Sequence, residues 1–208
     1  MREWTRCIGS FAPVGKRIKN KKRFARMLVI AVVAAVALLG AAYLMGRVAD
    51  RLEYRLDYKD ELIEAADRYG LDRRLIAAVI HTESSNRSGV YSPAGAVGLM
   101  QLMPDTAGWI AEKQGREDYS EEQLLTPEVN IDLGCWYLSY LLDRYGNQRC
   151  AVAAYNAGPG NVDKWLSDER YGAGGALIAV PFKETEEYLL RIDRAYEKYT
   201  DLYEKELG

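Results

Sequence analysis

The chain has 208 residues, 49% of them hydrophobic, which favours one globular domain with additional segments and excludes a generally disordered chain. The net charge of −2 conceals an asymmetry: residues 1–26 carry nine Lys and Arg against one acid, whereas the remaining 182 residues carry 19 basic and 29 acidic side chains. One histidine and three cysteines do not make an ordinary zinc or Cys–His site, so no metal or organic cofactor is expected.

Residues 27–46 form an uncharged stretch of 20 residues, rich in Val, Ala and Leu. About 20 apolar residues are needed to cross a bilayer as a helix, and the Lys/Arg cluster comes immediately before this stretch. The positive-inside rule predicts a cytoplasmic basic tail over 1–26, a transmembrane helix over 27–46, a juxtamembrane linker over 47–54 and an extracytoplasmic domain over 55–208. The basic tail is interpreted as a topology signal that contacts anionic lipids, and no nucleic acid is expected as a partner.

A cleaved signal peptide is the main alternative to this membrane anchor. Signal peptides have a short basic region, an apolar core of about 7–15 residues and a cleavage site of small residues. Here both regions are long, and the acceptable cleavage sites, after Ala41 or Ala42, lie inside the apolar stretch. A buried core helix is a weaker alternative, because no face of the stretch carries a charged or strongly polar side chain. An uncleaved, single-pass signal-anchor in the cell membrane is therefore preferred.

Helix start and stop signals predict an all-α domain after the anchor. Asp72 is expected to cap a helix, Thr126-Pro127 places proline at a first helical position, and Gly70 and Gly146 mark helix ends. The middle of the second helix is apolar on every face, which predicts that it is buried. No convincing alternating strand is found. The expected helices cover 57–69, 73–85, 104–113, 127–145, 148–156 and 183–206, with a further turn capped by Asn161.

Two cysteines of the domain could form a disulfide in an oxidising compartment, but their placement argues against it. Cys135 lies near the middle of the helix that ends around Tyr145, and Cys150 follows the next turn. At about 1.5 Å per helical residue, Cys135 is well over 10 Å from that turn, beyond the roughly 7 Å Cα limit for a disulfide. Both are interpreted as small core hydrophobes, and Cys7 lies in the basic tail.

Glu83 is the strongest candidate for chemistry among the acidic residues. It follows the apolar run and shares a helix face with Val79 and Ile80. A carboxyl group beside apolar side chains loses hydration, which raises its pKa. A carboxylic acid that keeps its proton near neutral pH is suited to protonate a glycosidic oxygen. On position alone, a helix-end glutamate directed at solvent stays open as the alternative.

Four short motifs accompany Glu83 in the order of the chain. They are Glu83-Ser84, Gly98-Leu99-Met100-Gln101, Ala154-Tyr155-Asn156-Ala157-Gly158, and Tyr188 after Glu184-Thr185. Together, at compatible spacing, they resemble the soluble lytic murein transglycosylase family (the SLT family, glycoside hydrolase family 23), which has the lysozyme-like fold that goose-type lysozymes share. The resemblance covers about residues 55–200. One departure is Asn86, where the family often has an aromatic residue.

The resemblance implies a role for each motif. Glu83 would be the sole catalytic acid and base. Glu184 is interpreted as a helix-start acid or a structural hydrogen-bond partner, and His81 receives no role. Met100 could instead fill the core, and Gly98 could serve backbone shape alone. The substrate-binding positions implied are Ser92 near Glu83 or the N-acetyl group, Gly98, Met100 and Gln101 along the sugar groove, Tyr155 and Asn156 at the scissile sugar, and Tyr188 closing the site.

The implied reaction needs only one carboxyl group, whereas most glycosidases pair two. Glu83 would protonate the oxygen of the β-1,4 bond between N-acetylmuramic acid and N-acetylglucosamine in peptidoglycan, while the substrate's N-acetyl group stabilises the positive charge. Glu83 would then take the proton of the C6 hydroxyl, which closes a 1,6-anhydro ring without consuming water. The reaction is formally that of a carbon–oxygen lyase.

Two other functions stay open at this stage. A lysozyme-like muramidase would cleave the same bond with water. A non-catalytic wall-binding module would bind the strands inside an assembly, such as secretion machinery, without turnover. The expected partners are peptidoglycan glycan strands and the cell membrane, and an association with cell-wall or secretion machinery is left open.

Overall fold

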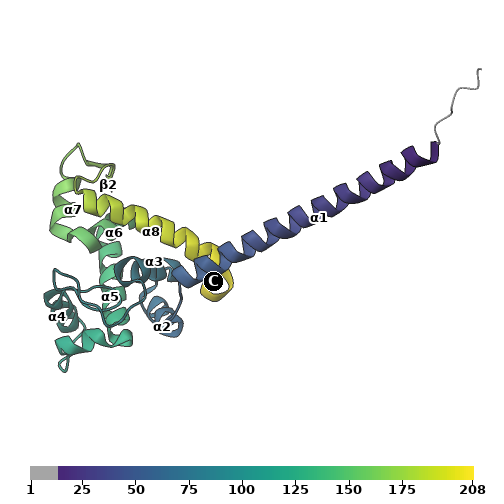
Figure 1. The fold of residues 1–208 in the computed structure, drawn as a ribbon. Helices are drawn as coiled ribbons and strands as arrows, with labels where there is room; N and C mark the ends of the chain where they lie inside the picture. The colour runs from purple at the N-terminus through teal and green to yellow at the C-terminus, as the bar shows by residue number, and fades with distance from the viewer. Residues whose placement is uncertain (1–13) are drawn as a thin grey trace, which may run out of the picture. The chain divides into compact units, whose positions relative to one another are not determined.

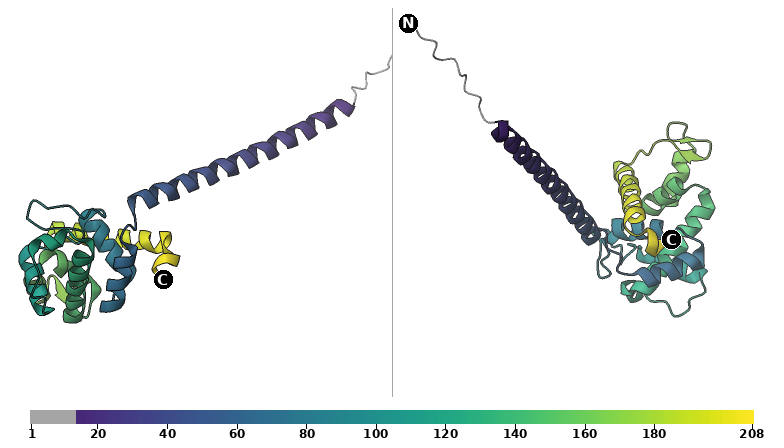
Figure 2. Two further views of the ribbon diagram at one scale, coloured as in Figure 1. Left: turned by 90° about the horizontal axis from the view of Figure 1, so that it is seen from below. Right: turned by 90° about the vertical axis from the view of Figure 1, so that its right-hand side faces the viewer.

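In a computed structural model of the chain, residues 14–208 are described, with side chains from residue 21 onward (Figures 1 and 2). Two units are distinct: the N-terminal one ends at Val48, and Ala49–Gly208 form a compact unit with its own core. Helix α1, Val14–Glu53, accounts for all described residues of the N-terminal unit. Its last five residues belong to the compact unit.

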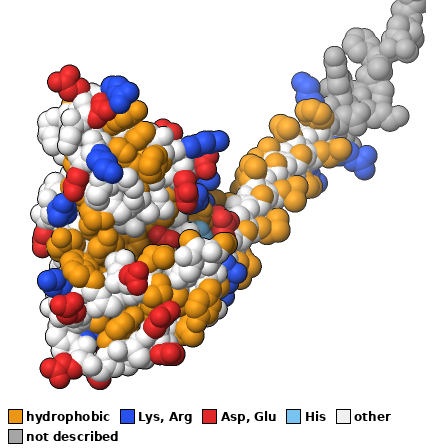
Figure 3. All heavy atoms as spheres, turned by 90° about the vertical axis from the view of Figure 1, so that its left-hand side faces the viewer, with side chains coloured by type: hydrophobic (Ala, Val, Ile, Leu, Met, Phe, Trp, Pro, Cys, Tyr) orange, Lys and Arg blue, Asp and Glu red, His pale blue; other side chains and the backbone are white. Residues whose placement is uncertain are grey.

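The apolar stretch near the N-terminus is helical throughout. Within α1, Lys21–Glu53 is long and apolar enough to cross a membrane by length and composition. Its large side chains are exposed on all sides, including Leu38 and Leu39, each 71% exposed. Figure 3 shows hydrophobic side chains along the visible face of this helix and Lys or Arg near its N-terminal part. Such a surface is unfavourable in water and suits a lipid environment.

The compact unit is helical, which confirms the predicted all-α class. Its helices are α2 (Lys59–Tyr69), α3 (Arg73–Ser84), α4 (Pro104–Lys113), η1 (Glu121–Leu125), α5 (Pro127–Tyr145), α6 (Gln148–Ala157), α7 (Pro159–Leu166), α8 (Lys183–Leu202) and α9 (Glu204–Leu207). A small hairpin, β1 (Gly172–Ala173) with β2 (Ala176–Leu177), was not expected. Strands of two residues are too short to produce an alternating pattern.

Helix boundaries follow the expected caps with three corrections. The carboxylate of Asp72 accepts a hydrogen bond from the backbone N–H of Arg74 at 2.8 Å, as an N-cap should. The first helix of the domain begins at Lys59, two residues later than predicted. Helix α7 begins at Pro159, with Gly158 as its N-cap, so Asn161 is not the cap. The last predicted helix is interrupted at Tyr203 and continues as α9.

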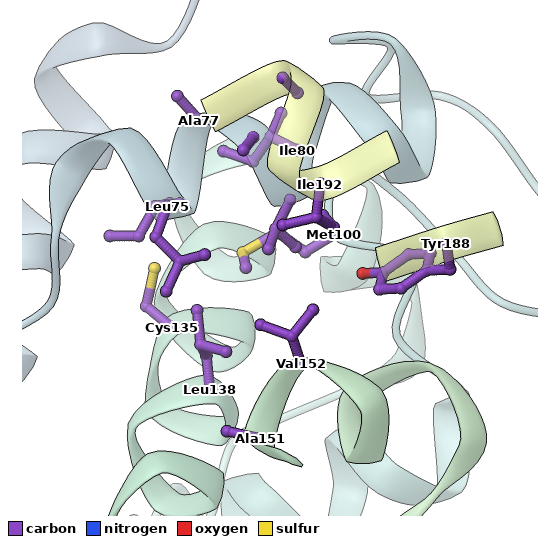
Figure 4. Packing of buried hydrophobic residues seen from close by; sticks show 14 of the residues in the cluster. Leu75, Ala77, Ile80, Met100, Cys135, Leu138, Ala151, Val152, Tyr188 and Ile192 are labelled. Carbon is purple, nitrogen blue, oxygen red and sulfur yellow. The ribbon is translucent and has the colours of Figure 1, made fainter. Parts of the chain in front are cut away.

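Helix α3 lies at the centre of the main core. Its residues Leu75–Ile80 are all at most 2% exposed, as the apolar run predicts. Figure 4 shows Ile80 near Ile192 of α8, Leu75 above Cys135 and Leu138 of α5, and Val152 of α6 in the lower part of the cluster. The two cysteines described in the domain, Cys135 and Cys150, are free and fully buried, as expected of core hydrophobes.

A second, smaller cluster of buried residues lies under α4 and η1. Its members are Val97, Leu102, Ala107, Ile110, Leu124 and Leu133. Tyr137 and Tyr155 pack against both clusters, so they lie where the two meet. The glycine-containing loop between α3 and α4 contributes residues to both clusters and connects them. Met100 and Tyr188 belong to the main cluster, and Tyr155 packs against both clusters.

Candidate active site

Glu83 lies in the last turn of α3, on the edge of the main core. Its Oε1 accepts a hydrogen bond from the hydroxyl of Tyr188, on α8, at 2.7 Å. Burial raises the pKa of Glu83 to about 7, while the Tyr188 hydrogen bond and the positive charge of Arg191 oppose this shift. Desolvation therefore outweighs both favourable contacts, and the carboxyl group exchanges its proton near neutral pH.

The backbone has an unusual geometry two and three residues after Glu83. Ser85 and Asn86 both have left-handed backbone conformations, with φ of 53° and 61°. Such conformations are uncommon for residues other than glycine and are concentrated at functional sites. Asn86 is buried, and its amide donates to the hydroxyl of Tyr199 at 3.4 Å. The residue that departs from the family pattern thus has a polar partner on α8.

Among the described residues, the contacts that shift the pKa of Glu83 come from a tyrosine and an arginine. Burial, Tyr188 and Arg191 account for the shift in its pKa, and no aspartate or glutamate contributes. Paired catalytic carboxylates lie about 5–9.5 Å apart and perturb each other's charge. The same residues contain no cluster of His, Cys, Asp or Glu that could hold a metal ion. The charged group that shifts the pKa of Glu83 is thus a cation, Arg191, and not a second acid.

The loop before α4 depends on Asn130, a fully buried polar residue of α5. Its amide nitrogen donates to the carbonyls of Val97 and Leu124 at 3.0 and 2.9 Å, and its Oδ1 accepts from the N–H of Met100 at 2.7 Å. Gly98 has φ of 83°, and a Cβ there would lie 2.2 Å from the Asn130 amide nitrogen. Gly98 therefore permits a close approach of loop and helix that no other residue allows.

Met100 is fully buried, so its side chain fills the core. This agrees with the core-filling interpretation of Met100 rather than with a side chain that lines the sugar groove. Its backbone does connect to the site, because its carbonyl accepts a hydrogen bond from the hydroxyl of Tyr155 at 2.9 Å. Burial raises the pKa of Tyr155, and the charge of nearby Glu83 raises it further. Tyr155 therefore stays protonated and is close enough to Glu83 to interact with its charge.

Gln101 and Ser92 are partly exposed and have partners within the loop. The Gln101 amide donates to the carbonyls of Gly98 and Val90 at 2.8 and 3.3 Å, and its own φ is 47°. The hydroxyl of Ser92 accepts from the N–H of Ala96 at 2.9 Å. Among the described hydrogen bonds, none joins either residue to Glu83. Both side chains stabilise the loop that carries them.

The third and fourth motifs meet through one hydrogen bond. The hydroxyl of Thr185, which is buried, donates to Oδ1 of Asn156 at 2.8 Å. Thr185 precedes Tyr188 by one helical turn, so this contact connects the end of α6 to the part of α8 that carries the Glu83 partner. Glu184 lies exposed in the first turn of α8, where a helix-start acid is expected.

An aromatic hollow of about 410 Å³ begins beside Tyr137, whose ring lies 5.5 Å from that of Tyr155. It is lined by Asp105, Thr106, Trp109, Tyr137, Tyr140 and Pro159. Figure 3 shows a hollowed face on which hydrophobic side chains line the depression and charged groups lie around it. Aromatic faces flanked by a few polar groups are suited to bind sugar rings.

Three site residues received no role from the sequence. Asn130 could have been found, because a polar residue in an otherwise apolar helix needs buried hydrogen-bond partners. Thr185 was noted only as part of a motif. Arg191 could not have been found, because its contact with the site depends on how α8 packs against α3: its guanidinium lies 5.7 Å from the ring centroid of Tyr188.

The all-α fold and a helix-end glutamate whose pKa is raised by burial are the features of a lysozyme-like domain. Residues 60–176 match the family described as "Transglycosylase SLT domain". This match covers more than half of the chain, which therefore belongs to that family, as its motifs predicted.

Similar proteins agree with this assignment. The soluble lytic murein transglycosylase of Salmonella typhimurium is 38% identical over 164 residues, which are 76% of this chain and 25% of that protein. The membrane-bound lytic murein transglycosylase C of Histophilus somni is 32% identical over 65% of this chain and 44% of its own length. The crystal structure of the 70 kDa soluble lytic transglycosylase of Escherichia coli matches with a TM-score of 0.67 and 34% identity, over 73% of this chain and 25% of that one. The chain thus spans a quarter to under half of the length of these relatives.

Proposed function

We propose that this chain is a membrane-anchored lytic transglycosylase that cleaves the β-1,4 bond between N-acetylmuramic acid and N-acetylglucosamine in peptidoglycan. The observation that carries the proposal is the environment of Glu83: one buried carboxyl group with a pKa of about 7, one tyrosine partner and no second carboxylate acting on it. Relatives and solved structures named as lytic transglycosylases support the substrate class.

Glu83 acts first as an acid in this proposal. Its proton passes to the bridging oxygen, the bond to C1 of the muramic acid breaks, and the N-acetyl group of the substrate stabilises the positive charge that develops. The Tyr188 hydroxyl donates to Oε1 of Glu83 and stabilises the carboxylate that remains. Glu83 then accepts the proton of the C6 hydroxyl, whose oxygen bonds to C1. Because this second step is intramolecular, it gains from proximity and needs no water.

The other predicted residues position the strand. Tyr155 and Asn156 border the scissile sugar, and the loop that carries Ser92, Gly98, Met100 and Gln101 forms one side of the groove. The side chain of Met100 is buried, so Met100 contributes through its backbone carbonyl, which accepts the hydrogen bond that orients Tyr155. The aromatic hollow beside Tyr137 extends the groove by stacking on further sugar rings.

The test uses the full chain in non-ionic detergent on purified peptidoglycan, with mass spectrometry of the released fragments. We expect 1,6-anhydro-muramic acid ends from the wild type, none from Glu83→Gln, and unchanged release from Glu197→Gln, which removes an exposed carboxylate from α8. Reducing ends heavier by one water would assign a muramidase instead. Strand binding without any product would assign a wall-binding module.

The location is a separate part of the proposal: a cytoplasmic tail over 1–26, a transmembrane helix over 27–46, a linker over 47–54 and an extracytoplasmic domain over 55–208. It rests on the apolar helix within Lys21–Glu53, on the basic cluster before it and on membrane-bound relatives. A reporter enzyme that folds only outside the cytoplasm, fused after Gly208, should be active, and the membrane-extracted chain should have its full mass. An inactive reporter, or a chain cut after Ala41 or Ala42, would contradict the topology or the anchor.

A further inference from the structure

The last turn of helix α1, after the apolar stretch, has partners within the compact unit. The carboxylate of Asp50 accepts a hydrogen bond from Nζ of Lys198, on α8, at 2.7 Å. The guanidinium of Arg51 lies 5.2 Å from the ring centroid of Tyr203, directly after α8. Both contacts are partly exposed, and exposed ionic contacts contribute little stability on their own. They show nevertheless that the expected linker over 47–54 is in part bound to the domain.

Tyr54, the residue after α1, makes the buried contact of this segment and is 6% exposed. Its ring stacks on that of His81 in α3, with centroids 4.4 Å apart and planes at 26°. It also meets the ring of Tyr199 in α8 edge-on, with centroids 6.1 Å apart. The rings of His81 and Tyr199 lie 6.2 Å from each other. Aromatic pairs have preferred geometries, so this ring cluster sets the spacing of α3 and α8 at this point.

The ring cluster holds the chain on both sides of Glu83. His81 lies two residues before Glu83 in the same helix. Asn86, three residues after Glu83, donates from its amide to the hydroxyl of Tyr199 at 3.4 Å. The same helix, α8, carries Tyr188, which donates to Oε1 of Glu83 at 2.7 Å. The distance between Glu83 and Tyr188 therefore depends on how firmly the end of α3 is held against α8.

We infer that Tyr54 is a positioning residue for Glu83: through His81 and Tyr199, its ring holds the end of α3 against α8. The inference rests on the proposed function for the role of Glu83. It adds that the segment between the membrane anchor and the domain takes part in setting the geometry of the active site. None of the contacts described for Tyr54 involves Glu83 itself, so Tyr54 acts through its neighbours.

The test compares variants of the full chain in non-ionic detergent, with soluble glycan strands as the substrate. In Tyr54→Ala, which lacks the ring, we expect the rate at saturating substrate to fall about tenfold or more, because Glu83 is displaced. The half-saturating concentration should not change, because the groove is intact. The ¹³C signal of the Glu83 carboxyl group, which should titrate near pH 7 in the wild type, should do so about one pH unit lower, because water enters beside α3.

Tyr54→Phe is the conservative variant, because it keeps the ring and removes only the hydroxyl. Among the described residues, no hydrogen-bond partner is found for that hydroxyl, and the contacts of Tyr54 are made by its ring. Both the rate and the Glu83 titration should therefore match those of the wild type. Equal losses in Tyr54→Phe and Tyr54→Ala would overturn the role assigned to the ring.

Tyr203→Ala is the matched control. Tyr203 is 8% exposed and stacks on Tyr199 at 5.7 Å, but its described ring contacts include none with α3. This variant should lower the melting temperature about as much as Tyr54→Ala and leave the rate per folded molecule and the Glu83 titration unchanged. If Tyr54→Ala also lowers stability alone, Tyr54 is only a structural residue and the inference is overturned.

Tyr54→Leu replaces Tyr54→Ala if the alanine variant does not fold, because it keeps apolar bulk without an aromatic stack. The same two measurements then decide, and a wild-type rate with a wild-type titration would overturn the inference. The proposed reaction fails separately: reducing ends in place of 1,6-anhydro ends from the wild type would refute it. A lower Glu83 inflection in Tyr54→Ala than in Tyr54→Phe would still support the positioning role.

Discussion

Glu83 and Asp132 are both buried acids in the same domain, and their surroundings differ. Asp132 accepts hydrogen bonds from Arg68, Arg116 and the hydroxyl of Tyr69, so its negative charge is fully matched. Glu83 has a single neutral donor, Tyr188. Burial without a paired positive charge favours the protonated form of Glu83, whereas Asp132 has two guanidinium groups that form charge-assisted hydrogen bonds with it. Burial alone therefore does not mark a catalytic acid; the number of charged partners distinguishes it from a structural one.

The largest expected effect comes from removing the proton of Glu83. Glu83→Gln keeps the shape and the hydrogen-bonding capacity of the side chain but cannot donate or accept the reacting proton. General acid–base catalysis contributes about 10²–10⁴-fold, so release of 1,6-anhydro fragments should fall by about a thousandfold or more. The melting temperature should not decrease. Residual activity above a tenth of the wild type would show that another group supplies the proton.

Asp132→Asn should affect stability rather than chemistry. The substitution leaves Arg68 and Arg116 facing a neutral amide. Breaking a buried ion pair costs about 3–5 kcal/mol, and because both arginines are partly exposed we expect about 3 kcal/mol, measured by denaturant unfolding. Activity per folded molecule should be unchanged. A loss of activity without a loss of stability would mean that Asp132 takes part in the reaction.

The pH dependence of stability sharpens the comparison further. The pKa of Glu83 is about 7 in the folded chain and near its ordinary value of 4.5 when unfolded. Between these values the folded state binds one more proton, so stability falls as pH rises from 4.5 to 7 and is constant above. After discounting for partial exposure, we expect the wild type to lose about 2 kcal/mol relative to Glu83→Gln across this window. If the difference in unfolding free energy between the wild type and Glu83→Gln stays constant from pH 4.5 to 7, the raised pKa of Glu83 is contradicted.

The smallest effect is expected from Tyr188→Phe. Its hydroxyl lowers the pKa of Glu83 and stabilises the carboxylate formed during the reaction. Without it, the alkaline limb of the rate profile should move to higher pH, and the rate should fall about tenfold. A merely structural role would lower stability and leave the pH profile in place, so the profile is the decisive measurement.

The helices could be predicted because their ends carry local signals. Asp72, Pro127 and Gly146 act through contacts within one or two turns, which a sequence displays directly. The hairpin after α7 has no such signal, because strands of two residues give no period. The break at Tyr203 was also missed, since the amphipathic pattern of α8 continues across it.

The site could be predicted only in part. The apolar run made Glu83 a candidate, and the family motifs around it decided the assignment. The placement of Tyr188, 105 positions later, near the site followed from the resemblance alone. Whether Met100 faces the groove or the core depends on the contact of its loop with Gly134 of α5, which no local pattern reveals. The roles of Asn130 and Arg191 likewise depend on tertiary packing.

The role of Glu83 as proton donor is tested most simply by titrating its carboxyl group. The ¹³C signal of this carboxyl group, assigned by its absence in Glu83→Gln, would be followed by NMR from acid to alkaline pH. We expect an inflection near pH 7, well above the ordinary value, because burial outweighs the Tyr188 and Arg191 contacts. An inflection near 4.5 would mean that Glu83 is ionised at neutral pH, and the single-acid mechanism would have lost its proton donor.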